Sequence, residues 1–113
     1  MHPISVETLC TWLAERRQVS LVDVSPKAAW AEGAIPGSLH INAYEALKAH
    51  DPSALADLSL PRDRPVVTIC AAGQTASQVA AEQLAAQGLQ VFFLEGGLYA
   101  WRAAGYPTQV YRD

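Results

Sequence analysis

Short apolar runs alternate with amphipathic segments along most of the chain. Val66–Ile69 is a run of mainly β-branched residues, which is typical of a strand buried on both faces. Further apolar runs predict three more strands, and the amphipathic segments between them predict helices. The predicted strands lie at 19–24, 39–41, 66–69 and 89–94, and the predicted helices at 5–17, 27–32, 43–49, 77–87 and 98–104. This alternation indicates an α/β fold with a mostly parallel central sheet and helices on both faces.

Cys70 stands directly after the strand predicted at 66–69, and a short run of small and polar residues separates it from the helix predicted at 77–87. Parallel α/β sheets place their active sites at this carboxyl edge. A helix N-terminus offers unpaired N–H groups and a partial positive charge of about half a unit, and small residues let the backbone approach a sulfur atom closely. We therefore treat Cys70 as a candidate nucleophile in a backbone cradle. A buried structural cysteine is the alternative that this stretch alone leaves open.

The composition indicates one folded domain spanning residues 1–113. Half of the residues are hydrophobic and 17% are charged, which suffices for a core without disulfide or metal staples. Because the net charge is −3 and the basic residues are scattered, we expect no nucleic-acid partner. No apolar run reaches the roughly 18 residues of a membrane span, and no secretion signal is visible, so we expect a cytoplasmic protein. Cys10, Cys70 and the three histidines lack ligand spacing, so we expect no metal or other cofactor.

Four segments carry a recognisable pattern: 23–26, 30–38, 70–73 and 94–101. In order and spacing they resemble the signature segments of single-domain rhodanese-like proteins. The resemblance covers nearly the whole chain and implies a five-stranded, mostly parallel sheet. It also implies a sulfurtransferase in which Cys70 is the catalytic nucleophile that carries sulfur as a persulfide. The backbone of the following loop would hold the charged terminal sulfur; its residues are Ala71, Ala72, Gly73, Gln74, Thr75 and Ala76.

Departures from the family pattern bear on the sulfur donor. Thiosulfate-using members commonly carry basic residues at the positions of Ala71 and Thr75, and no charged side chain occurs between Arg64 and Glu82. The loop is similar instead to those of mercaptopyruvate sulfurtransferases and of rhodanese domains attached to persulfide-metabolising enzymes. We therefore expect mercaptopyruvate or an organic or protein persulfide, rather than thiosulfate, as donor, with a thiol as acceptor. A non-catalytic rhodanese-like binding or sulfur-carrier module is the alternative.

Further residues have more limited interpretations. Related phosphatases need a longer loop that ends in arginine, which is missing after Ala76, so we expect no phosphatase activity. Trp101 and Cys10 are expected to pack in the core, and Tyr99 to face the cysteine loop. The glycine pair at 96–97 predicts a tight turn beside that loop. Asp23 is interpreted either as a hydrogen-bond acceptor for loop amides or as a buried structural carboxylate.

Overall fold

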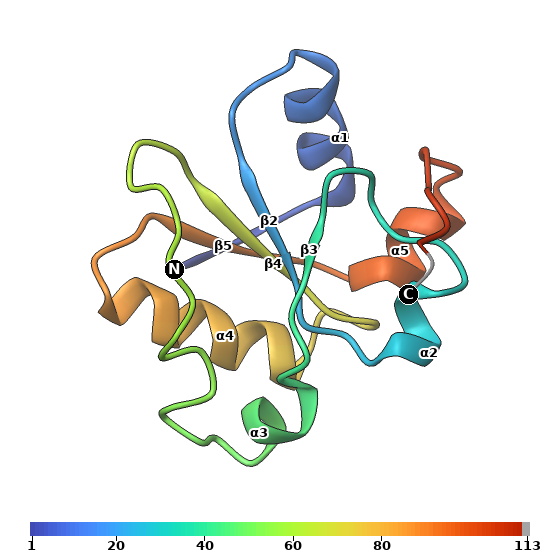
Figure 1. The fold of residues 1–113 in the computed structure, drawn as a ribbon. Coiled ribbons are helices and arrows are strands. Elements are labelled where there is room, and N and C mark those ends of the chain that lie inside the picture. The colour runs from blue at the N-terminus through green and yellow to red at the C-terminus, as the bar shows by residue number, and fades with distance from the viewer. Residues whose placement is uncertain (112–113) are drawn as a thin grey trace.

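Five parallel strands form the central sheet of the computed structural model, which describes residues 1–111 (Figure 1). The spatial order is β1-β5-β4-β2-β3, and each neighbouring pair is parallel. This confirms the predicted fold class, with a sheet that is parallel throughout. The strands are β1 His2–Ile4, β2 Ser20–Asp23, β3 Leu39–His40, β4 Val66–Ile69 and β5 Val91–Leu94.

The strand β1 was not predicted from the sequence. It has only three residues, and two of them, His2 and Pro3, are exposed, so it shows no apolar run. It lies at the edge of the sheet against β5, where proline is tolerated because an edge strand leaves one side of its backbone unpaired.

Strand β4 occupies the centre of the sheet, between β2 and β5. All four of its residues are buried, as the run of β-branched side chains predicted. Ser20 pairs with Val66, and the parallel register continues to Asp23 opposite Ile69. Cys70, the next residue after β4, therefore leaves the sheet at the middle of its carboxyl edge, beside the end of β2.

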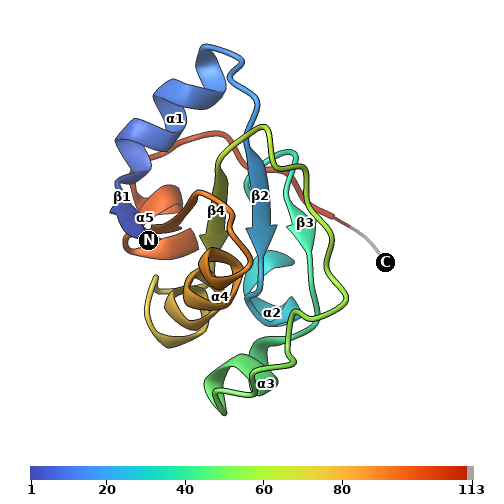
Figure 2. The ribbon, with the colours of Figure 1, turned by 90° about the vertical axis from the view of Figure 1, so that its left-hand side faces the viewer.

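Helices cover both faces of this sheet (Figure 2). Val22 and Val66 pack in the core on the side of α3 and α4, whereas their neighbours Leu21 and Val67 pack on the side of α1, α2 and α5. The change of side at each successive residue is the two-residue period of a strand covered on both faces. The helices are α1 Val6–Ala14, α2 Lys27–Trp30, α3 Tyr44–Lys48, α4 Thr75–Ala86 and α5 Gly97–Ala103.

The five predicted helices all occur, but their ends differ from the prediction. The helix α4 begins at Thr75, two residues before the predicted start, so the last residues of the cysteine loop form its first turn. Trp101 is buried in the core as predicted, whereas Cys10 is only half-buried against it.

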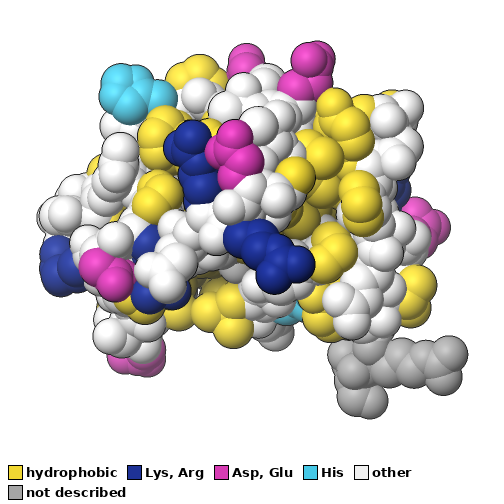
Figure 3. Space-filling view, turned by 90° about the horizontal axis from the view of Figure 1, so that it is seen from above, with side chains coloured by type: hydrophobic (Ala, Val, Ile, Leu, Met, Phe, Trp, Pro, Cys, Tyr) yellow, Lys and Arg dark blue, Asp and Glu magenta, His cyan; other side chains and the backbone are white. Residues whose placement is uncertain are grey.

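The surface carries mixed charge. On the face drawn in Figure 3, basic side chains lie among acidic ones and form no single large patch, so that face has no strong field of one sign. Within residues 1–111, no helix has the length and apolar character needed to cross a membrane.

Candidate active site

Cys70 sits at the carboxyl end of the central strand and is almost completely buried, with 4% of its surface exposed. Its Sγ lies 3.2 Å from the hydroxyl oxygen of Ser77, which is fully buried on α4. The Ser77 hydroxyl donates to the carbonyl of Gln74 at 3.3 Å, and Thr68 donates to the Ser77 carbonyl at 2.7 Å. A small polar network thus fixes the sulfur against the first turn of α4.

The backbone that follows Cys70 offers hydrogen-bond donors that the described part of the chain leaves unused. No N–H group from residue 71 to residue 77 donates a hydrogen bond within residues 1–111. Those from 75 onwards belong to the first turn of α4, where a helix has no internal acceptors for its N–H groups. The segment can therefore bind a negatively charged atom through its backbone alone.

Several carbonyl groups of the same loop are already occupied. Those of Cys70 and Ala71 accept hydrogen bonds from the N–H groups of Leu98 and Tyr99, each at 3.0 Å, at the start of α5. The Gly73 carbonyl accepts from the side-chain amide of Gln78 at 3.2 Å. Because these carbonyl acceptors are paired with α5 and α4, the loop is held in place while its backbone N–H groups stay unpaired.

Two glycines make this close approach of the loop and α5 possible. Gly97 has φ of 58°, and a Cβ atom placed on it would lie 2.2 Å from the Cys70 carbonyl oxygen. Gly73 has φ of 71°, and its Cβ atom would lie 2.6 Å from both the Leu94 carbonyl oxygen and the Gly96 nitrogen. No side chain fits at either position. The predicted tight glycine turn beside the cysteine loop is confirmed.

A pocket of about 290 Å³ gives access to Cys70. Every residue of the predicted site except Gly73 lines it, and Gly73 instead holds the loop against the turn before α5. Tyr99 also lines it, as predicted, from the first turns of α5. The remaining wall comes from Tyr44 and Lys48 of α3, which the sequence interpretation missed. Their separation by four positions on one helix face was a signal that they share a surface.

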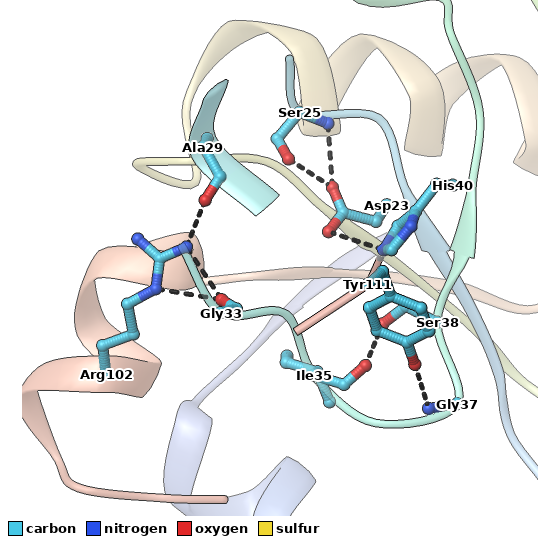
Figure 4. Close-up of polar contacts among 10 residues, drawn as sticks. All are labelled: Asp23, Ser25, Ala29, Gly33, Ile35, Gly37, Ser38, His40, Arg102 and Tyr111. Carbon is cyan, nitrogen blue, oxygen red and sulfur yellow. Dashed lines mark hydrogen bonds and ion pairs between the residues drawn. The ribbon is translucent and has the colours of Figure 1, made fainter. Parts of the chain in front are cut away.

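A second polar cluster lies beside this site at the end of β2 (Figure 4). Asp23 is fully buried, and its Oδ1 accepts hydrogen bonds from the Ser25 amide at 2.9 Å and the Ser25 hydroxyl at 2.5 Å. Its Oδ2 faces His40 Nε2 at 3.7 Å, and neither atom has a hydrogen-bond partner in the described chain. Burial raises the pKa of Asp23, although the hydrogen bonds from Ser25 act in the opposite direction.

Aromatic rings and an arginine complete the surroundings of this cluster. The His40 ring stacks on Trp30 at 4.3 Å between centroids and meets the edge of Tyr111 at 4.6 Å. Arg102 of α5 donates to the carbonyls of Gly33 and Ala29, which fixes the segment that follows α2 (Figure 4). Asp23 therefore acts as the acceptor for an adjacent turn, and it makes no hydrogen bond to the cysteine loop.

No group of three or more histidine, cysteine or acidic side chains within residues 1–111 gathers to hold a metal ion. The side chains that line the pocket supply a thiol, two phenols, a threonine hydroxyl, a glutamine amide and one lysine, and the buried Ser77 hydroxyl lies against the sulfur.

Fold and site together define an α/β protein with a cysteine loop at the carboxyl edge of a parallel sheet. The family model for the rhodanese-like domain matches residues 6–104. A sulfurtransferase of Allochromatium vinosum is 33% identical over 108 residues, which are 95% of this chain and 94% of that protein. The thiosulfate sulfurtransferase GlpE of Ectopseudomonas mendocina is 37% identical over 90 residues, 79% of this chain and 74% of that protein.

Solved structures show the same relationship. A rhodanese-related protein from Thermoplasma volcanium superposes with a TM-score of 0.76 at 25% identity, over 98% of this chain and all of that one. A rhodanese-like domain protein from Staphylococcus aureus gives 0.75 at 27% identity, over 99% of this chain and all of that one. The chain belongs to the rhodanese-like family, and within that family it is a sulfurtransferase. The predicted family, fold and activity class are thus confirmed, whereas the roles of the site residues and the single domain stay predictions.

Proposed function

We propose that the chain transfers a sulfane sulfur through a persulfide on Cys70. The observation that carries the proposal is the row of unused N–H groups at 71–77 around a buried cysteine. A persulfide anion extends one atom beyond Sγ into the pocket, where such donors stabilise its charge without a side-chain base.

The reaction takes two displacement steps at sulfur. In the first, the Cys70 thiolate attacks the outer sulfur of an organic persulfide, the sulfur–sulfur bond of the donor breaks, and the donor leaves as a thiolate. With mercaptopyruvate the carbon–sulfur bond breaks instead, and pyruvate leaves as its enolate. In the second, an acceptor thiolate attacks the outer sulfur on Cys70, forms a new persulfide and releases the Cys70 thiolate. Ser77 lies within hydrogen-bond distance of Sγ, so its hydroxyl can turn from the Gln74 carbonyl and donate to the thiolate in both steps.

We propose a donor with low charge, mercaptopyruvate or an organic or protein persulfide, in preference to thiosulfate. Among the residues that line the pocket in the described chain, Lys48 alone carries a charge, and the loop itself is neutral. A dianion loses more hydration than a monoanion on entering such a pocket, with one cation to compensate. Because three similar proteins are named as thiosulfate sulfurtransferases, thiosulfate is the comparison donor in any test.

Mass spectrometry of the intact protein tests this function. The wild type is incubated with mercaptopyruvate, an organic persulfide or thiosulfate, and we expect a gain of one sulfur atom that peptide analysis places on Cys70. The gain should vanish in Cys70→Ala and persist in Cys10→Ala, which removes the other cysteine. No gain with any donor, or a gain on Cys10 alone, contradicts the proposal. A higher kcat/KM for thiosulfate than for the other donors contradicts the donor preference.

Turnover separates the enzyme from the sulfur-carrier alternative. With an excess of donor and a small thiol acceptor, an enzyme releases many equivalents of product for each Cys70. A carrier stops after one equivalent, even though its Cys70 gains sulfur. We expect many turnovers, because the pocket leaves a route for small molecules to a sulfur that is otherwise buried.

A further inference from the structure

Lys48 forms part of the wall of the Cys70 pocket although it lies far from the cysteine loop in sequence. We infer that Lys48 determines donor specificity by binding the anionic group at the non-reacting end of the donor. The inference rests on the proposed function and adds to it the residue that recognises the donor.

The packing of helix α3 against α4 fixes the backbone of the exposed Lys48 relative to the loop. Leu47 is fully buried in the core that α3 shares with α4. The side-chain amide of Gln83 on α4 donates to the Asp51 carbonyl just after α3 at 2.8 Å. Because α4 also carries the end of the cysteine loop, the lysine and the reactive sulfur belong to one packed unit.

The charge of Lys48 is available to a ligand. Its Nζ lies 5.0 Å from the centroid of the Tyr44 ring, a contact that orients the ammonium group without neutralising it. No carboxylate within residues 1–111 forms an ion pair with Lys48. An unpaired ammonium at the wall of an otherwise neutral pocket favours an anion.

The donor chemistry matches this arrangement. Mercaptopyruvate carries a carboxylate at the end opposite its sulfur, and thiosulfate carries sulfonate-type oxygens there. Such a molecule can place its sulfur at Cys70 while its oxygens face Lys48. A persulfide of an uncharged thiol has no second anionic group, so its binding does not depend on Lys48.

Donor kinetics of Lys48→Gln test the inference. We expect KM for mercaptopyruvate and for thiosulfate to rise about fivefold to tenfold, as for the loss of one charge-assisted hydrogen bond. The kcat for both, and KM for the persulfide of 2-mercaptoethanol, should stay within about twofold. Lys48→Arg should restore most of the affinity. The matched control is Lys27→Gln, which removes the same charge from a residue outside this pocket. Equal changes in KM for all three donors, or an unchanged KM for mercaptopyruvate and thiosulfate, would overturn the inferred role of Lys48.

Binding without chemistry keeps the inference separate from the proposed function. Thiosulfate is titrated into Cys70→Ala and into Cys70→Ala/Lys48→Gln, with amide shifts of the loop followed by NMR. We expect weaker binding by about fivefold to tenfold in the double variant, and a steeper loss with salt when Lys48 is present. Equal affinity of the two variants overturns the role of Lys48. Failure of the wild type to gain sulfur on Cys70 overturns the proposed function instead.

Discussion

The ends of β4 and β2 lie side by side at the carboxyl edge of the sheet, because Ile69 and Asp23 pair in register. After β4, the chain leaves backbone N–H groups unused and presents no charged side chain. After β2, it buries a carboxylate that accepts the Ser25 amide and hydroxyl. The first end offers unpaired hydrogen-bond donors, whereas the second holds a buried acceptor.

From this difference we expect the loop after β4 to serve binding and the turn after β2 to serve folding. The unused N–H groups at 71–77 remain available to water or to a ligand. The buried Asp23 instead fixes the turn into α2 through Ser25. We therefore expect changes at the β4 end to reduce activity most, and changes at the β2 end to alter stability.

The largest effect is expected for Gly97→Ala. The new Cβ atom would lie 2.2 Å from the Cys70 carbonyl oxygen and 2.6 Å from that of Ala71, so the loop must move away from α5. Displacement of a reacting group by about 1 Å costs on the order of a hundredfold in rate. We expect a loss of sulfur transfer of at least that size, measured as kcat/KM, with a fall in stability of about 3 kcal/mol in denaturant unfolding.

Gly105→Ala is the control at the other end of α5. Gly105 also has a positive φ, 75°, but a Cβ atom there meets no atom within 4 Å. It should cost about 1 kcal/mol of stability, from backbone strain alone, and leave kcat/KM of the folded protein unchanged. Similar activity losses in both variants would mean that strain in α5, and not contact with the loop, controls the site.

A smaller effect is expected for Ser77→Ala. This change removes the one side-chain hydroxyl that contacts Cys70 Sγ in the described chain, at 3.2 Å. The backbone N–H groups remain, so persulfide formation should slow about threefold to tenfold, the worth of one hydrogen bond. Stopped-flow consumption of an organic persulfide measures the rate. Ser53→Ala, whose hydroxyl contacts Asp51 on an exposed turn, is the control. An unchanged rate in Ser77→Ala would leave the backbone as the sole source of stabilisation.

Much of this organisation is visible in the sequence. Strands β2, β4 and β5 and the five helices follow from apolar periodicity and from glycine or proline stops, because each buries at least part of an apolar face. The strand β1 was not predicted, because an exposed edge strand of three residues needs no apolar pattern. The site at Cys70 was predictable because strand, loop and helix are contiguous in the chain.

Residues that reach the site from a distance were not predictable in this way. Tyr44 and Lys48 line the pocket only because α3 packs against α4, and no local pattern specifies that contact. Ser77 is adjacent in sequence but was interpreted as a helix start. The earlier start of α4, at Thr75, turns its hydroxyl toward the sulfur. The Asp23–His40 contact likewise depends on the pairing of β2 with β3, which could not be predicted from the sequence pattern.

The smallest effect is expected for Asp23→Asn, which tests the other end of the comparison. Burial raises the pKa of Asp23 above its ordinary value of 3.8, and this outweighs Ser25, His40 and Arg102, which lower it. The native state then holds the proton more tightly than the unfolded state does. The contribution of Asp23 to stability is therefore highest below pH 3.8 and falls as the pH rises through the window up to the raised pKa.

Asparagine keeps an oxygen for the two Ser25 hydrogen bonds but cannot ionise. The free energies of unfolding of the two proteins, from urea titrations at a series of pH values, should agree within about 1 kcal/mol near pH 3.5. They should diverge in favour of the variant as the pH rises, while kcat/KM stays unchanged. Asp57→Asn, at an exposed site, is the control: it changes the net charge equally but removes no buried carboxyl. A stability difference that instead moves in favour of the wild type as the pH rises would show that the ion pair with His40 outweighs burial, so the β2 end would stabilise the fold through its charge.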